Sequence, residues 1–178
     1  MKLAHLAAAA LFVPTLAFAA GSGSSHPPKS TKTTSVCETG QVYDTKTKSC
    51  LDVKSDLIDD DTRYDAVREL AYDGQYDRAL RVLASMSNPA ESRVLTYKGF
   101  IARKQGRTAD AMGFYTAALD ADADNILARS YMGQGLVVMG QTSAAKAQLA
   151  EIRTRGGAGT WAEASLAEAI ATGVTRNY

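Results

Sequence analysis

The chain has 178 residues and a formal net charge of +1 at neutral pH. This length suits one domain. A charge so close to zero gives no electrostatic reason to expect a nucleic acid or an anionic membrane surface as the partner, so we predict no nucleic-acid binding. Alanine is abundant and aromatic residues are few, which favours closely packed helices.

Residues 1–19 have the pattern of a secretory signal peptide, which is removed from the mature protein. Lys2 supplies a positive start, residues 3–16 are almost continuously apolar, and residues 17–19 form an A-x-A cleavage signal. The alternative is a membrane anchor, but a membrane span needs about 20 apolar residues. We predict cleavage near Ala19 and Ala20, no integral membrane segment after cleavage, and a periplasmic or secreted protein.

Two short segments follow the predicted signal. Residues 20–35 are dominated by Gly, Ser, Thr, Pro and Lys, a composition that buries too little apolar surface to order itself, so we predict a disordered linker. Residues 36–53 contain both cysteines, Cys37 and Cys50. In an oxidising compartment such a pair normally forms a disulfide. Strand-forming residues 41–43 and the polar stretch after them predict a small stapled hairpin.

The hairpin also resembles part of the peritrophin-type chitin-binding modules, through its C-x2-G-x-VYD-x2-T-x2-C pattern from Cys37 to Cys50. This resemblance implies binding of a peptidoglycan-like or chitin-like glycan. Those modules carry further cysteines and several exposed aromatics, whereas this segment has one cysteine pair and one aromatic, Tyr43. A structural hairpin is therefore our first interpretation, and glycan binding is the alternative.

From residue 56 onward, apolar residues recur at helical spacing, and we expect helices to residue 173. Asp59–Asp61 predict one helix start. Residues 88–91 (Asn-Pro-Ala-Glu) predict a second, capped by Asn88 with Pro89 in the first turn. Residues 160–163 form a capping box for a last helix. Further helices are expected to begin at about residues 76, 108, 125 and 142.

Two stretches of this helical region repeat one another at a period of 34 residues, which is typical of stacked helical arrays. Gly99 and Gly133 are expected to let the paired helices approach closely. Gly106 and Gly140 are expected to make the turn between the helices at positive φ. A looser first copy lies 32 residues earlier (Gly74 to Gly106), which predicts a connecting loop two residues shorter. The repeat-packing residues are Gly99, Gly106, Ala111 and Ala118 in one copy and Gly133, Gly140 and Ala145 in the next.

With this pattern, residues 60–155 resemble the tetratricopeptide repeat family. The resemblance implies an all-α fold, an α-solenoid of about three helix pairs, with the last helix as a C-terminal cap. Two positions depart from the family pattern, because Arg129 replaces the usual aromatic and Ala123 stands where a proline is typical. Arrays of this family commonly bind a partner peptide or helix on the concave face, which is lined by the first helix of each pair.

By register, that face combines tyrosines and basic residues, which are enriched at protein interfaces. The alternative interpretation is that the tyrosines pack between helices and the basic residues are solvated. The predicted partner-binding residues are Tyr64, Arg68, Arg93, Tyr97, Phe100, Arg103, Lys104, Tyr131 and Gln134.

The sequence holds no nucleophile motif, phosphate-binding glycine loop or metal-ligand cluster. Residues 120–125 resemble the start of a calcium loop but lack its glycine and its final glutamate. We therefore predict no catalytic residue, no metal and no cofactor. The sequence indicates a non-enzymatic module that binds a protein partner, an adaptor or assembly factor of a bacterial cell envelope.

Overall fold

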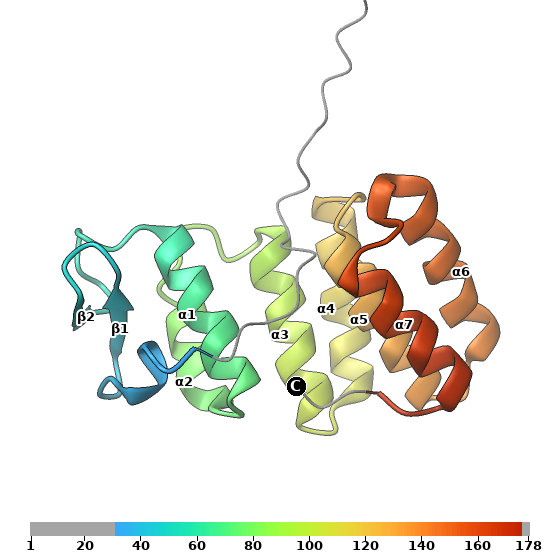
Figure 1. Cartoon of the computed structure of the whole chain (residues 1–178), viewed down its shortest axis with the longest axis horizontal. Coiled ribbons are helices and arrows are strands. Elements are labelled where there is room, and N and C mark those ends of the chain that lie inside the picture. Colours follow the sequence, from blue (N-terminus) through green and yellow to red (C-terminus); the bar gives the residue numbers. More distant parts are fainter. Residues whose placement is uncertain (1–30, 176–178) are drawn as a thin grey trace, which may run out of the picture.

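A computed structural model describes residues 31–175, and the predicted signal peptide lies outside this range. Within it, the chain is mostly helical, with one small antiparallel hairpin (Figure 1). The strands are β1 (Gln41–Asp44) and β2 (Ser49–Asp52), preceded by a short 3-10 turn, η1 (Thr34–Val36). The helices are α1 (Asp60–Tyr72), α2 (Tyr76–Leu83), α3 (Ser92–Lys104), α4 (Thr108–Ala121), α5 (Ile126–Val138), α6 (Thr142–Ile152) and α7 (Trp161–Thr172).

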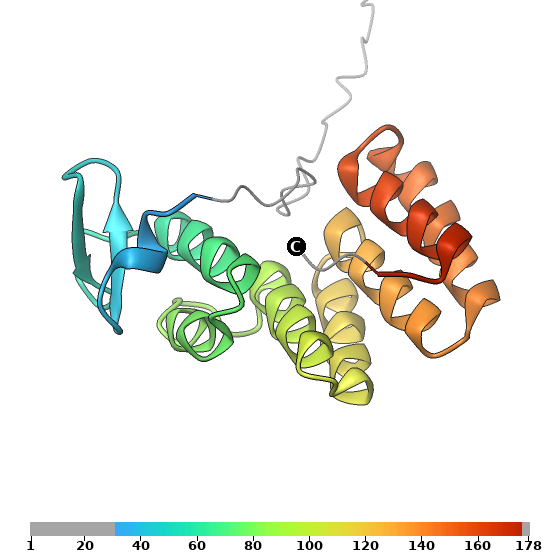
Figure 2. The ribbon, with the colours of Figure 1, turned by 60° about the horizontal axis from the view of Figure 1, so that its bottom comes forward.

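Consecutive helices pack together as α1 with α2, α3 with α4, and α5 with α6. The first helices of these pairs also contact one another in order, α1 with α3 and α3 with α5, and α5 contacts the last helix, α7. The hairpin lies at one end of the molecule beside α1, and α7 lies toward the other end, as both views show (Figures 1 and 2). Among residues 31–175, no helix combines the length and the apolar character needed to cross a bilayer.

The turn inside each helix pair has the same geometry in all three pairs. Gly74, Gly106 and Gly140 have φ of 77°, 79° and 73°, a region that is strained for other residues. The N–H after each glycine donates to the carbonyl five residues back, at 2.8 to 2.9 Å, and the glycine N–H donates to the carbonyl three back. These two bonds satisfy carbonyls at the helix end, as in a Schellman motif. The predicted glycine turns are confirmed.

The looser first copy differs from the second in its second helix. Helix α2 has 8 residues and α4 has 14. The chain between α2 and α3 covers residues 84–91, whereas only residues 122–125 join α4 to α5. The expectation of a shorter loop was therefore wrong, because the first copy has a shorter helix and a longer loop.

That longer loop also moves a predicted helix start. Helix α3 begins at Ser92 with Glu91 at its N-cap, and Asn88 lies three residues earlier. The Asn88 side chain accepts a hydrogen bond from the Ala90 N–H at 3.0 Å, which is an Asx turn rather than a helix cap. The predicted cap at Asp59 is confirmed, because Asp59 accepts from the Thr62 N–H. The predicted capping box at residues 160–163 is half present: Thr160 accepts from the Glu163 N–H, but Glu163 accepts from the Gly159 N–H and not from that of Thr160.

Five of the repeat-packing residues are buried at helix contacts, whereas the turn glycines Gly106 and Gly140 are exposed. Ala111, Ala118 and Ala145 are fully buried, and their small side chains allow the helices to approach closely there. A Cβ atom added to Gly99 would lie 2.5 Å from the Tyr115 ring of α4, so α3 and α4 meet there. The prediction for Gly133 needs correction, because its closest neighbour is Leu166 of α7 and not a residue of its paired helix α6.

Candidate functional site

Four aromatic side chains form a continuous cluster across the first helices of the pairs. Tyr64 of α1 meets Tyr97 of α3 edge to face at 5.5 Å between centroids, and Tyr97 meets Tyr131 of α5 edge to face at 6.3 Å. Phe100 lies 4.9 Å from Tyr131. We call Tyr64, Tyr97, Phe100 and Tyr131 the aromatic ladder. Each such pair adds about 0.5–1.5 kcal/mol beyond the apolar area it buries.

The aromatic ladder belongs to the core rather than to the surface. All four rings are at most 5% exposed. Burial raises the pKa of the Tyr64, Tyr97 and Tyr131 hydroxyls above the ordinary value. Of the two interpretations of these tyrosines, packing between helices is the one that the structure shows.

Four cationic side chains border the aromatic ladder, and we call Arg68, Arg93, Arg103 and Lys104 the basic rim. Arg93 Cζ lies 5.0 Å from the centroid of Tyr64. Arg103 Cζ lies 5.8 Å from Phe100 and 6.0 Å from Tyr131, and Lys104 Nζ lies 5.4 Å from Phe100. Cations within about 6 Å of an aromatic face are attracted to its negative potential. The aromatic ladder therefore orients Arg93, Arg103 and Lys104.

Two members of the basic rim have carboxylate partners that were not predicted from the sequence. Arg93 pairs with Asp61 at 2.5 Å and also with Glu91. Arg68 lies 3.6 Å from Asp65, one helical turn before it. The i, i+3 spacing of Asp65 and Arg68 is a sequence signal for the latter pair. The Asp61–Arg93 pair joins α1 to α3 and left no comparable signal, because it depends on how the two helices pack.

Arg103 is the most deeply buried member of the basic rim, at 7% exposure. Its Nη2 donates to Gln134 Oε1 at 3.4 Å. Among residues 31–175, its Nε has no acceptor and no carboxylate forms an ion pair with it. Burial raises the pKa of the nearby Tyr115 hydroxyl to about 12, with the Arg103 charge acting in the opposite direction. Within the described part of the chain, the hydrogen-bond acceptor of Arg103 is therefore a neutral amide, and the charged group that acts on it is the cation of Lys104.

Lys104 follows Arg103 in sequence and is half-buried. Its burial, together with the charge of Arg103, lowers the Lys104 pKa to about 8. A lysine with this pKa exchanges its proton close to neutral pH. The net charge at the C-terminal end of α3 therefore depends on the protonation state of Lys104, which burial and the charge of Arg103 both affect.

Gln134, the last predicted partner-binding residue, lies in the core between α5 and α7. It is fully buried, and its Nε2 donates to Ser165 Oγ of α7 at 3.1 Å. The residues of the predicted face that are not fully buried are therefore Arg68, Arg93 and Lys104, and all three are half-buried.

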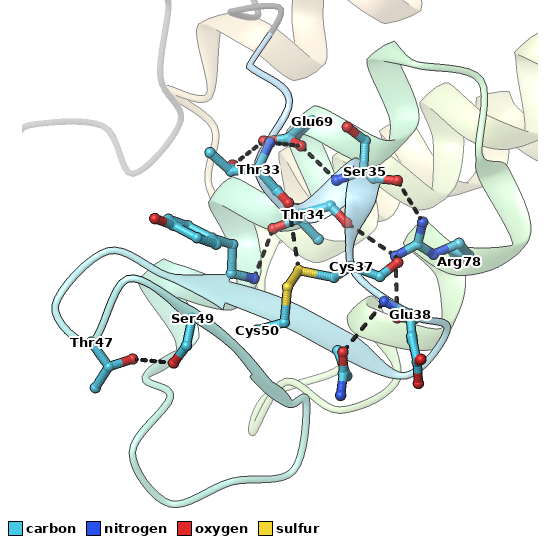
Figure 3. Close-up of a disulfide and its surroundings, with 12 residues drawn as sticks. Thr33, Thr34, Ser35, Cys37, Glu38, Thr47, Ser49, Cys50, Glu69 and Arg78 are labelled. Carbon is cyan, nitrogen blue, oxygen red and sulfur yellow. Dashed lines mark hydrogen bonds between the residues drawn. A yellow bond between two sulfur atoms is a disulfide. The ribbon is translucent and has the colours of Figure 1, made fainter.

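The second candidate site, the hairpin, is held against α1 and α2 (Figure 3). Strands β1 and β2 pair antiparallel, and the predicted Cys37–Cys50 disulfide is present. Val42 of β1 is fully buried in the core cluster that includes the α1 side chains. These contacts describe a structural role for the hairpin. The glycan-binding alternative stays a prediction.

Residues 31–35, which were predicted to belong to the disordered linker, instead contact α1. Glu69 of α1 is 5% exposed and accepts from the N–H groups of Thr33 and Ser35 at 2.9 and 2.6 Å. The hydroxyls of Thr31 and Thr33 also donate to it. Burial raises the Glu69 pKa, but these hydrogen bonds outweigh burial and leave the pKa below its ordinary value. The sequence gives no local signal for these hydrogen bonds, because residues 31–35 and Glu69 are far apart in the chain.

Arg78 of α2 fixes the same segment from the other side (Figure 3). Its guanidinium donates to the carbonyls of Thr34, Ser35 and Cys37 at 2.9 to 3.0 Å. One cation thus satisfies three backbone carbonyls that lie outside any regular ladder, as buried backbone groups require.

The chain matches no protein-family model, and comparisons with curated proteins and with solved structures found no match. Within residues 31–175, no group of three or more His, Cys, Asp or Glu side chains is placed to hold a metal ion.

Proposed function

We propose that this protein is a non-enzymatic interaction module of the bacterial periplasm or cell envelope, an adaptor or assembly factor built on a tetratricopeptide-like solenoid. The observation that carries the proposal is the basic rim on the aromatic ladder, which runs over α1, α3 and α5. The repeated glycine turns and the successive contacts of the first helices support the solenoid.

The proposed mode of binding follows from the burial of these residues. The aromatic ladder is a rigid platform, and the three half-buried cations that border it, Arg68, Arg93 and Lys104, are the groups that a partner segment can reach. Side chains already ordered by packing lose less conformational entropy on binding. Arginine supplies planar, multiple donors and is enriched among residues that dominate interface energies.

The proposed compartment rests on the N-terminal sequence and the cysteines. A signal peptide pattern precedes the domain, and the only two cysteines of the chain form a disulfide. Disulfides persist in oxidising compartments and are rare in the cytosol. Fractionation of cells that express the chain tests this part, with periplasmic recovery of the cleaved form as the expected result.

The binding face is tested by photocrosslinking in cells. A photoreactive residue at position 68 of α1 is compared with one at Lys146, an exposed position on α6. We expect protein adducts from position 68 and none from position 146. Equal adducts from both positions, or none from position 68, would contradict the proposal. Tyr97→Ala is unsuitable as a test because Tyr97 is 2% exposed and its loss would perturb folding.

A further inference from the structure

Residues 31–36, which we call the latch, are held against α1 and α2 mainly by hydrogen bonds. The N–H groups of Thr33 and Ser35 donate to Glu69 at 2.9 and 2.6 Å. The one large apolar side chain of the latch, that of Val36, is 71% exposed. The latch therefore buries little apolar surface, and segments of this kind open at a lower free energy than the rest of a fold.

The centre of the latch lies between two opposite charges from neighbouring helices (Figure 3). The Ser35 N–H donates to the Glu69 carboxylate, and the Ser35 carbonyl accepts from Arg78 Nη1 at 3.0 Å. Within residues 31–175, neither Glu69 nor Arg78 forms an ion pair. A carboxylate that is only 5% exposed is costly without such bonds, so Glu69 depends on the latch for its partners.

The disulfide marks the point at which the latch ends. Cys37 follows the latch directly and is bonded to Cys50 of β2. Arg78 Nη2 also donates to the Cys37 carbonyl at 2.9 Å, so it holds the chain beyond the latch as well. Two amides outside the latch depend on Thr34, because the Cys37 N–H donates to its carbonyl at 3.1 Å and the Tyr43 N–H to its hydroxyl at 3.0 Å.

We propose that the latch opens and closes as one unit while the disulfide holds the hairpin in place, and that Glu69 and Arg78 form a direct ion pair in the open form. Departure of Ser35 removes the group between the two charges and frees Arg78 Nη1, whereas Nη2 keeps the Cys37 carbonyl. Opposite charges attract strongly where water is partly excluded. The pair replaces the bonds that the latch gives up, so the same residues have two alternative arrangements.

This conformational device does not depend on what the protein binds, so it stands or falls separately from the proposed function. Hydrogen exchange of the full chain, measured by NMR in increasing urea below the unfolding transition, tests the opening. The reporters should share one opening step with little dependence on urea, because the latch exposes little surface. The reporter amides are those of Thr33, Ser35, Cys37 and Tyr43.

The reference is the Val53 amide, which donates to the Gly40 carbonyl at 2.9 Å and should exchange more slowly, with a larger dependence on urea. Glu69→Gln should speed the reporters about tenfold and leave Val53 unchanged. Glu38→Gln, at an exposed position, is the matched control and should change neither. Equal exchange of Val53 and the reporters in the wild type, or acceleration of Val53 together with them in Glu69→Gln, would overturn the proposal.

The ion pair of the open form is tested with Ser35→Pro, which removes an N–H that Glu69 accepts and so favours the open form. The Glu69 carboxyl is titrated by carbon NMR in Ser35→Pro, alone and combined with Arg78→Gln or Arg78→Lys. Arg78→Gln should raise the Glu69 midpoint by about one pH unit, because a neighbouring cation lowers a carboxyl pKa. Arg78→Lys should keep it low. Equal midpoints in Ser35→Pro and its Arg78→Gln combination would contradict the ion pair and overturn the proposal.

Discussion

Gly99 of α3 and the ring of Tyr115 in α4 lie so close that a Cβ on Gly99 would be 2.5 Å from Tyr115 Cε1. The ring is fully buried, so it has little room to move. This contact sets the distance between α3 and α4, the two helices of the second pair. It also positions α3, which carries half of the aromatic ladder and most of the basic rim.

Replacement of Gly99 by alanine should therefore destabilise the fold by about 1–3 kcal/mol, the usual cost of overpacking a core. The measurement is urea unfolding followed by circular dichroism. Gly113 is the matched control, because it lies in α4 and a Cβ added there would meet no atom within 4 Å. Gly113→Ala should stabilise by about 0.5–1 kcal/mol through helix propensity alone. Stabilisation by both substitutions would show that the Gly99 contact does not constrain the helix pair.

Glu69→Gln should remove part of the acid sensitivity of the protein. The lowered pKa of Glu69 means that its carboxylate contributes stability that is fully present above the unfolded-state pKa of about 4.3. That contribution is lost as the pH falls through the lower pKa of the folded state. Unfolding free energies at neutral pH and at about pH 3 should differ less in the variant than in the wild type. Glu38→Gln, at an exposed position, should keep the full difference.

Arg78→Ala should release the segment between η1 and β1 from α2. The guanidinium bonds to the Thr34 and Cys37 carbonyls are lost, while the disulfide remains. Hydrogen exchange at the Cys37 and Tyr43 amides, which donate to Thr34, should become faster. Arg81→Ala, on the exposed side of the same helix, should leave these amides protected. Unchanged exchange in Arg78→Ala would mean that the disulfide and Glu69 are sufficient to hold this segment in place without Arg78.

Removal of the disulfide with Cys37→Ala and Cys50→Ala should lower the free energy of unfolding by about 3 kcal/mol, from the entropy of the loop that it closes. The helices should persist at room temperature, because Glu69 and the buried Val42 still attach the hairpin. Helical circular dichroism and thermal melting measure both effects. A reducing agent should lower the melting temperature of the wild type and leave the double variant unchanged. A loss of helix in the double variant would contradict this division of roles.

The Lys104 side chain should titrate with a midpoint of about 8 in an NMR experiment on the labelled amine. Burial and the charge of Arg103 are the two causes, so Arg103→Met should move the midpoint upward. Because the folded-state pKa lies below the unfolded value, stability gained from deprotonation appears as the pH rises from about 8 toward about 10.4. A Lys104→Met variant should lack that rise. An ordinary lysine midpoint in the wild type would show that this amine is well solvated.

The helix pairs could be predicted because their signals are local. A glycine that needs positive φ, followed five residues later by a small buried alanine, marks each turn in the sequence and in the structure. The cap at Asp59 and the cap at Thr160 are equally local. The predicted helix cap at Asn88 was wrong because this local signal is ambiguous. Asparagine makes both helix caps and Asx turns, and only the chain that follows it decides between them.

The sequence by itself determined the helices, their turns, the disulfide and which residue types lie on the α1, α3 and α5 positions. Only the tertiary structure decided that Tyr97 is buried while Lys104 is half-buried, and that Gly133 faces α7. It also decided that Glu69 holds residues 31–35. The physical reason is range: helix propensity and caps act within a few residues, whereas burial and ion pairing depend on segments that the fold brings together from about thirty residues apart or more.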